Sequence, residues 1–483
     1  MILKKYVFPL ILVLLLSCNS DKNITEDDLA FNKESISEPI NFDLDAIKKR
    51  GVLKAIVVGG PTSFFIYRGE TMGFEYELLK RFTENLGVKL EIIVAKDFDV
   101  LADWLNTGKG DIVAHGFTPT ISRKKRFDFT NYLYLTKQVL VQKKPKNWRK
   151  LKLHEINKQL KKDAIELIND TVSVRRYSSY KMRLENLMDE IGGEIYIDEV
   201  DSNITTDELI GMVSKGEIKY TIADNTLAKM HTYHFKNLDI STPVSLSQKA
   251  SWVLRQNTSN LKNELNIWID GMKKTTDFHV IYNRYFKNRR SITKHIDSDY
   301  FLNETGKLSP YDELIKKYAR NLPWDWVLLA SQIFQESRFD PNASSWANAH
   351  GLMQIMPSTA KDLGVLNTSN PEESIKAGTR YLKQLWNEWD MITDDNERIK
   401  FTLASYNAGL SHVKDAVTLT KLENGNPNIW TEHVEQAMLK LTYRKYYTKP
   451  EIKYGYVHGI EPVSYVKDIF ERYGLYTQIL EGE

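Results

Sequence analysis

Cysteine is almost absent from this sequence, and its scarcity excludes whole classes of protein. Cys18 is the single cysteine among 483 residues, so the chain forms no intramolecular disulfide and no cysteine-rich zinc or iron–sulfur site. A surplus of one charge is also lacking, because 66 Lys and Arg stand against 63 Asp and Glu. A dedicated nucleic-acid-binding protein needs a basic surface for its phosphate contacts. We therefore expect no metal site and no nucleic-acid partner.

Long apolar runs are also scarce, and the one near the N-terminus is too short to cross a bilayer. It covers residues 6–16 and follows the positive charges of Lys4 and Lys5. A spanning helix needs ~20 apolar residues, whereas a run of this length with a basic start is typical of a secretory signal. The sequence therefore predicts an exported protein.

The motif Leu-Leu-Ser-Cys at positions 15–18 resembles the lipobox of bacterial lipoproteins. The resemblance implies that residues 1–17 are a cleaved signal peptide and that Cys18 is acylated on its sulfur and its new amine, which anchors the chain stably. Residues 18–44 are then the lipid anchor and a polar, flexible tether. Because Asn19 and not Asp follows the cysteine, we expect the periplasmic face of the outer membrane. The alternative is an uncleaved membrane anchor with a bystander thiol.

Two patterns of apolar residues divide the rest of the chain. Short apolar strands alternate with helical spacing in the first part, as in a strand over 52–58 and a helix over 74–86. This alternation predicts an α/β architecture. From residue 311 onward the apolar spacing is helical. The expected units are an α/β domain over 45–290, a linker over 291–308 and a mainly α domain over 309–483.

One glutamate of the helical domain lies in an apolar setting. A helix is expected to begin at Asp325, which can cap it, and Glu336 lies near its end, before Pro341. A carboxylic acid among apolar side chains has a raised pKa and becomes a proton donor near neutral pH. Most glutamates at helix ends are simply solvated, so this pattern alone does not identify a catalytic group.

Three motifs then occur in the order found in the soluble lytic transglycosylase family. They are Gln-Glu-Ser at 335–337, Gly-Leu-Met-Gln-Ile-Met-Pro at 351–357 and Ala-Ser-Tyr-Asn-Ala-Gly at 404–409. The resemblance implies a lysozyme-like domain in which Glu336 alone protonates the oxygen between N-acetylmuramic acid and N-acetylglucosamine. The muramic 6-hydroxyl then closes on C1 to leave a 1,6-anhydro end, and neither water, metal nor cofactor is needed.

The same resemblance implies further residues along the glycan groove. They are Ser337, Met353, Gln354, Tyr406, Asn407 and Tyr465. Ordinary alternatives exist, because Met353 could fill the core, which is the commoner use of methionine, and Tyr465 could do the same. Asn348 departs from the family, which usually has glycine there. Asn tolerates a left-handed backbone better than other non-glycine residues, so we expect the loop to survive.

The segment Gly-Phe-Thr-Pro-Thr-Ile-Ser-Arg at 116–123 resembles the periplasmic amino-acid-binding proteins, the solute-binding family 3. The resemblance implies two lobes, the first over about 45–140 and 242–290 and the second over about 141–241. It also implies that Arg123 clamps an α-carboxylate, as planar guanidinium groups do, and that Asp224 holds the amino group. The full implied set is Gly116, Thr118, Arg123, Ser178 and Asp224. The alternative is a scaffold in which Arg123 only makes a salt bridge.

Taken together, the whole chain is similar to the membrane-bound murein transglycosylases that fuse these two domains. We therefore expect an envelope-bound lyase acting on peptidoglycan, with an amino acid or muropeptide as the candidate ligand and regulator of its first domain. One alternative is a catalytically inactive, wall-binding sensor. The other is a hydrolytic muramidase with the same acid and a water nucleophile. The three differ in their products, which are anhydro ends, none, or reducing ends.

Overall fold

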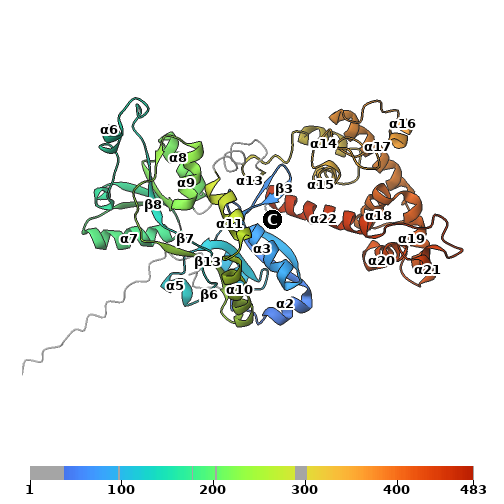
Figure 1. Ribbon diagram of the computed structural model, residues 1–483, viewed down its shortest axis with the longest axis horizontal. Helices are drawn as coiled ribbons and strands as arrows, with labels where there is room; N and C mark the ends of the chain where they lie inside the picture. The colour runs from blue at the N-terminus through green and yellow to red at the C-terminus, as the bar shows by residue number, and fades with distance from the viewer. Residues whose placement is uncertain (1–36, 96–97, 177, 202–203, 289–301, 482–483) are drawn as a thin grey trace, which may run out of the picture.

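The computed structural model describes residues 37–95, 98–176, 178–201, 204–288 and 302–481. The signal peptide, Cys18 and most of the tether and linker lie outside these ranges, so the lipid anchor stays a prediction. No helix within the described ranges is both long and apolar enough to span a bilayer. Figure 1 shows an α/β part and a helical part joined by the long helix α22. The predicted order, a two-lobed α/β domain followed by a mainly α domain, is confirmed.

The first lobe is built on a six-stranded mixed sheet of order β4-β1-β5-β13-β6, with β7 paired to β13. Its strands β1 and β4 are parallel, while β13 runs antiparallel to β5. The strand expected over 52–58 and the helix expected over 74–86 are both confirmed. The strands are β1 (Val52–Val58), β4 (Lys89–Ala95), β5 (Ile112–Phe117), β6 (Phe127–Phe129), β7 (Tyr134–Thr136) and β13 (Gln248–Arg255). The helices are α2 (Leu44–Arg50), α3 (Phe74–Leu86), α4 (Leu101–Asn106), α5 (Ile121–Lys124), α10 (Ser259–Met272), α11 (Thr276–Tyr282) and η3 (Asn283–Lys287).

The second lobe has a five-stranded sheet of order β10-β9-β11-β8-β12. The chain enters it between β7 and β8 and returns to the first lobe between β12 and β13, so two extended segments connect the lobes. Its strands are β8 (Gln138–Lys143), β9 (Thr171–Arg175), β10 (Tyr196–Val200), β11 (Tyr220–Asp224) and β12 (Leu238–Asp239). Its helices are α6 (Leu153–Asn157), η2 (Ala164–Leu167), α7 (Ser179–Ile191), α8 (Thr206–Lys215) and α9 (Asn225–His234).

The helical part packs α15, α18 and α22 together around one apolar core. Most residues of helix α15 are buried, which fits the apolar run that makes up its first half. The helices are α13 (Leu302–Thr305), α14 (Asp312–Ala319), α15 (Trp326–Ser337), α16 (Pro357–Asp362), α17 (Pro371–Glu388), α18 (Asp395–Ala408), α19 (Leu410–Leu422), η4 (Trp430–Val434), α20 (Glu435–Lys440), α21 (Arg444–Tyr447) and α22 (Ile460–Glu481).

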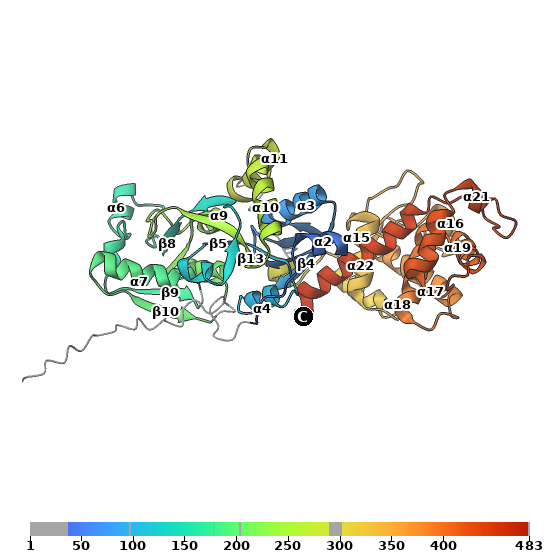
Figure 2. The same cartoon turned by 90° about the horizontal axis from the view of Figure 1, so that it is seen from below.

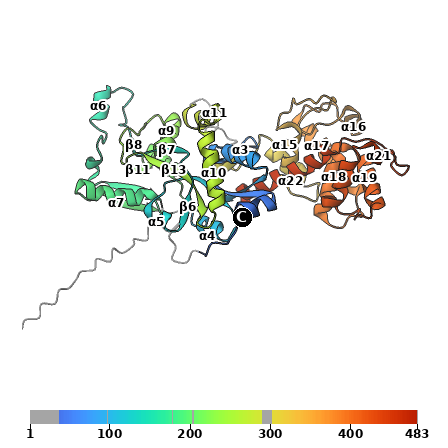
Figure 3. The ribbon, with the colours of Figure 1, turned by 60° about the horizontal axis from the view of Figure 1, so that its bottom comes forward.

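The C-terminal half of α22 leaves the helical core and packs against the first lobe, as Figures 2 and 3 show from two directions. The hydroxyl of Tyr476 donates a 2.6 Å hydrogen bond to the carbonyl of Gly69, and Gln478 Oε1 accepts one of 3.1 Å from the N–H of Val94. Gly69 lies in the turn between β2 (Phe65–Tyr67) and β3 (Glu70–Met72). A Cβ at Gly69 would lie 2.6 Å from the ring of Phe334 on α15, so this hairpin touches the helix that carries Glu336.

Candidate active site

Helix α15 positions Glu336 at its last turn. As predicted, Asp325 caps the start of this helix, and its carboxylate accepts hydrogen bonds from the N–H groups of Val327 (2.5 Å) and Leu328 (3.1 Å). The helix ends at Arg338, whose φ of 51° turns the chain away. Both ends of the helix are therefore fixed, and the helix is held by the core along its length. Glu336 is thus presented from a rigid element, which suits a reacting group.

The carboxyl of Glu336 is contacted by a phenol that is itself held by an amide. The hydroxyl of Tyr465, on α22, donates a hydrogen bond to Glu336 Oε1. Gln332, one turn before Glu336 and 1% exposed, donates from Nε2 to the Tyr465 oxygen at 3.1 Å. Because the amide occupies that oxygen as a donor, the single O–H of Tyr465 is directed to the carboxyl. Oε2 of Glu336 is then the oxygen that carries a transferable proton.

The surroundings of Glu336 hold its carboxyl near the point of half-protonation at neutral pH. Burial raises the pKa of Glu336 from 4.5 to about 7, and the hydrogen bond from Tyr465 opposes this rise. Among the residues that the structure describes, no second carboxylate contributes to the shift. Burial and the Glu336 charge also raise the pKa of Tyr406 and of Tyr465 well above 10, so both phenols stay protonated. The site therefore contains one acid and two neutral donors.

Tyr406 is tied to the motif at 351–357 through the backbone of Met353. Its hydroxyl donates a 2.7 Å hydrogen bond to the Met353 carbonyl. The Met353 side chain is fully buried against Gly378 of α17, where a Cβ would lie 2.2 Å from its sulfur. The implied position of this side chain along the groove is corrected, since the space above Gly378 draws it into the core. Met353 serves the site with its carbonyl.

Gln354 uses its amide nitrogen to fix the loop that it belongs to. Nε2 donates to the carbonyls of Ala343 (3.0 Å) and Gly351 (2.9 Å), which uses both amide hydrogens. Only Oε1 therefore remains to bind a ligand, as an acceptor. Asn348, in the same loop, has a φ of 64°, and the prediction that it takes a left-handed conformation is confirmed.

Ser337 and Asn407 are predicted groove residues that differ in exposure, since Ser337 is buried and Asn407 is exposed. The Ser337 hydroxyl is buried and donates to the carbonyl of Ile333 at 3.2 Å, so it points back along its own helix. The hydroxyl therefore makes no hydrogen bond to Glu336, and its contact with a glycan stays a prediction. Asn407 is exposed in the last turn of α18, where its amide is open to solvent. Asn407 remains a candidate for contact with a ligand.

Tyr465→Phe is expected to move the pH dependence of cleavage. Loss of the hydrogen bond that stabilises the carboxylate raises the pKa of Glu336 further above about 7. With Glu336 in its expected role as the acid, its protonated form starts the reaction, so the alkaline limb of kcat/KM moves to higher pH, while the plateau falls about tenfold through lost positioning. Gln332→Leu should give a smaller effect in the same direction. The control is Tyr473→Phe, whose phenol contacts Asp325 instead; an unmoved limb in Tyr465→Phe would contradict the assignment.

In the first lobe, the residues predicted at the ligand cleft follow the end of β5. Arg123 is 3% exposed, and its Nη1 donates a 3.2 Å hydrogen bond to the carbonyl of Thr118. The Thr118 hydroxyl donates to Gln248 Oε1 at 3.2 Å. A Cβ at Gly116 would lie 2.4 Å from the Tyr134 hydroxyl, so only glycine allows this contact. The guanidinium is thus held in place on the first lobe.

The second lobe contributes Asp224, at the end of β11, and Ser178, before α7. The N–H of Asp224 donates to the Tyr180 hydroxyl at 3.3 Å, and burial raises the pKa of the Asp224 carboxyl to about 7. Ser178 is buried and its hydroxyl donates to the carbonyl of Arg175 at 2.6 Å. Burial raises the pKa of the Tyr134 phenol in the first lobe, and the charges of Glu75 and Asp224 add to this rise.

Residues that the sequence did not single out join the two lobes at this cleft. The guanidinium of Arg175, in the second lobe, lies 3.7 Å from the ring centroid of Phe98 in the first. Burial, with the charges of Arg175 and Arg123, lowers the pKa of His115 to about 4 and keeps this imidazole neutral. No local sequence motif identifies these residues as part of the cleft. The one sequence feature that could have predicted it is the position of Arg175 at the carboxyl end of a strand.

Comparison with known proteins identifies both parts of the chain. The profile described as Transglycosylase SLT domain matches residues 313–429. The profile of the Bacterial extracellular solute-binding proteins, family 3, matches residues 53–288. The first match contains Glu336 and the motifs around it, and the second contains the predicted ligand cleft.

Full-length relatives extend both matches. The chain is 33% identical over 434 residues to the "Membrane-bound lytic murein transglycosylase F" of Desulfosudis oleivorans, covering 89% of this chain and 91% of the relative. It is 31% identical over 448 residues to the protein of the same name from Pseudomonas putida (strain W619), covering 91% and 88%. Among solved structures, holo ArgBP from T. maritima matches 50% of this chain and 98% of its own, with 25% identity and a TM-score of 0.40.

Proposed function

Because the chain belongs to the membrane-bound lytic murein transglycosylase F family, we propose that it cleaves peptidoglycan strands without water, with Glu336 as its single acid and base. The observation that carries this proposal is the Glu336 carboxyl, whose pKa is about 7 and whose Oε1 accepts the hydrogen bond of Tyr465. Near neutral pH a large fraction of this carboxyl is protonated and able to act as an acid.

The reaction uses one proton that returns to its origin. Glu336 Oε2 gives its proton to the oxygen that leaves C1 of N-acetylmuramic acid, and the C1–O bond breaks. The carboxylate so formed is stabilised by the O–H of Tyr465. It then takes the proton of the muramic 6-hydroxyl as that oxygen bonds to C1, which closes the 1,6-anhydro ring and restores the acid. No hydrolytic water or second carboxylate takes part, unlike in ordinary glycosidases.

Digestion of purified sacculi and mass analysis of the products tests this proposal. Release of 1,6-anhydro-muropeptides is the expected result. Reducing ends would instead indicate a hydrolytic muramidase, and the absence of any release would indicate a wall-binding sensor. Either of the last two outcomes would overturn the proposal.

We also propose that the two-lobed domain binds a free amino acid or a muropeptide and thereby regulates cleavage. A buried polar atom beside Asp224 supports this, because Gln138, which pairs with Asp224 across β8 and β11, has an Oε1 with no hydrogen-bond partner among the described residues. Such atoms are usually satisfied by a ligand or water. Two-lobed domains of this kind close around what they bind.

Arg123→Ala is expected to abolish the heat of ligand binding in calorimetry with amino acids and muropeptides. The variant removes a bidentate, charge-assisted contact, so affinity should fall at least about tenfold. Arg126→Ala, a neighbouring exposed arginine, is the matched control and should bind as wild type does. Identical heats from wild type and Arg123→Ala would end the assignment.

For location, we propose attachment of the mature chain to the outer membrane through acylated Cys18. The support is the lipobox at 15–18 and the name of the relatives, which are called membrane-bound. Mass spectrometry of the mature N-terminus distinguishes a lipidated Cys18 from an intact signal.

A further inference from the structure

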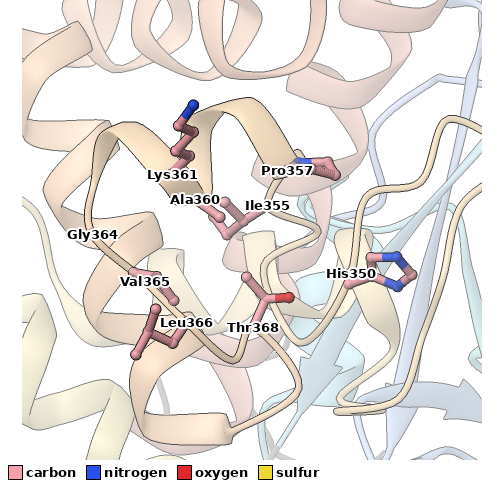
Figure 4. A pocket seen from close by; sticks show the side chains of 9 residues that line it. All are labelled: His350, Ile355, Pro357, Ala360, Lys361, Gly364, Val365, Leu366 and Thr368. Atoms are coloured by element: carbon pink, nitrogen blue, oxygen red, sulfur yellow. The ribbon is translucent and has the colours of Figure 1, made fainter.

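A basic arm leaves the second lobe between β8 and β9 and returns to it. The name stands for residues 144–162, which contain eight Lys and Arg and a single acidic residue, Glu155. Its short helix α6 lies at the end of the molecule opposite to the helical part, as Figures 1 and 2 both show. Cations are sparser elsewhere, as in the pocket of about 400 Å³ beside the motif at 351–357, where Figure 4 shows one lysine, Lys361. The arm therefore concentrates positive charge far from Glu336.

The base of the arm is fixed to the second lobe. The N–H of Lys144 donates a 2.7 Å hydrogen bond to the carbonyl of Asn237. The side-chain amide of Gln142 bonds to the backbone of Lys161 in both directions, at 2.8 and 2.9 Å. The ammonium of Lys161 pairs with Asp170 at 2.8 Å. The cations at the base thus serve the fold itself.

The cations farther out on the arm are not used in this way. They are Lys146, Arg149, Lys150, Lys152 and Lys158, and all five are exposed. None of them makes an ion pair with any part of the chain that the structure describes. The carboxylate of Glu155 accepts a 2.7 Å hydrogen bond from the backbone N–H of Lys152 and so is engaged by the main chain. The tip of the arm therefore presents five positive charges to an outside partner.

Apolar side chains lie among these cations. Leu153, at the start of α6, is 72% exposed. The ring of Trp148 is half-buried, and Lys144 Nζ and Arg149 Cζ lie 4.7 and 5.3 Å from its centroid. Exposed leucine and tryptophan beside lysine and arginine are typical of segments that lie in a membrane–water interface. A soluble polyanion would neutralise the cations but would leave Leu153 in water, so the mixture favours a bilayer.

We propose that the basic arm docks on a bilayer that contains anionic phospholipids. Its five outer cations lie at the phosphate groups, and Leu153 enters the boundary of the acyl chains. The proposed attachment through Cys18 supplies the bilayer. Ser37 lies 19 positions after Cys18, so the two are at most about 65 Å apart. Contact at the anchor and at the arm together orients the chain, with the second lobe at the membrane and the helical part directed away from it.

Vesicle binding by the chain without its acyl groups tests the arm alone. Residues 18–483 are produced without the signal, so that Cys18 stays a free thiol, and are sedimented with phosphatidylcholine vesicles that contain either no phosphatidylglycerol or about one third of it. Wild type should bind the anionic vesicles at least about 100-fold more tightly, since each cation near such a surface is worth about fivefold in binding. The triple variant Lys146→Glu, Arg149→Glu, Lys150→Glu should lose this preference. Leu153→Ser should weaken binding about tenfold, through lost burial of its side chain.

The matched control is the triple variant Lys80→Glu, Lys89→Glu, Lys383→Glu. It makes the same change of charge at exposed positions outside the arm and should keep the wild-type preference. Thermal unfolding checks that each variant folds. Equal binding of wild type to both kinds of vesicle, or an equal loss in the two triple variants, would overturn the proposal. So would an arm variant that binds vesicles as wild type does but loses binding to purified sacculi, because the partner would then be the wall. These measurements involve neither cleavage nor acylation, so the proposed function and the proposed anchor are tested separately.

Discussion

Glu336→Gln should lower the release of anhydro-muropeptides by about 10³-fold or more while leaving the fold intact. The amide has nearly the same shape as the carboxyl but has no proton to give to the leaving oxygen. The hydrogen bond from Tyr465 can still be accepted by the amide oxygen, so the surroundings need not move. Glu313→Gln, at an exposed position of α14, is the matched control and should cleave as wild type does. A Glu336→Gln variant that retains activity would remove this residue from its assigned role.

The same substitution should also stabilise the protein at alkaline pH. The folded-state pKa of Glu336 is about 7, against a usual 4.5, so the fold favours the protonated form. Wild type therefore loses stability as the pH rises from 4.5 through 7, and the glutamine variant does not. Each unit of pKa shift changes the free energy of unfolding by ~1.4 kcal/mol. Because water has partial access to the carboxyl, we expect the glutamine variant to gain about 2 kcal/mol and not the full value. Denaturant unfolding should show this gain at pH 8 and none at pH 4; equal stability at pH 8 would contradict the buried charge.

Gly351→Ala is expected to have the second large effect, on folding as well as on activity. Gly351 has a φ of +83°, and a Cβ would lie 1.9 Å from the carbonyl oxygen of Thr368. Either the loop moves or the chain is strained, at a cost of about 3 kcal/mol or more. Movement of this loop also displaces the Met353 carbonyl, to which Tyr406 is bonded. The midpoint temperature of thermal unfolding and the rate of cleavage should both fall.

Gly364→Ala separates the clash from the backbone strain. Gly364 also has a positive φ, +67°, but nothing lies within 4 Å of the position of its Cβ. Only the cost of a left-handed alanine remains, about 1 kcal/mol. Equal losses in the two variants would show that the contact with Thr368 contributes nothing.

Local patterns were sufficient to predict several elements, because each depended on neighbours in sequence, whereas the assignment of Glu336 as the acid came from the family resemblance. The strand over 52–58, the helix over 74–86 and the cap at Asp325 are all defined by spacing within one element. The polar environment of Glu336 was not predictable in this way. Gln332 is a buried polar residue of α15, and its partner Tyr465 is 133 positions away. Only the fold brings the amide, the phenol and the carboxyl together.

The direction of a side chain was equally hard to predict when its contact was distant. The motif that contains Met353 indicated a groove residue, yet the missing side chain of Gly378 opens a hole that the methionine fills. The direction of the buried Ser337 hydroxyl was also not predicted. It donates its hydrogen bond to a carbonyl of its own helix. Backbone conformations were easier to predict than side-chain directions, as the left-handed conformation of Asn348 demonstrates.

The helix α22 contributes to both parts of the chain, although their sequences look modular. Tyr465 near its start serves Glu336, while Tyr476 and Gln478 near its end are bonded to the first lobe. Ile66 of the β2–β3 hairpin belongs to the helical core. A chain that began at residue 309 would keep every catalytic motif but lose this cover, and the end of α22 would present an apolar face to water. The linker predicted from the sequence therefore does not divide the chain into two parts without mutual contact.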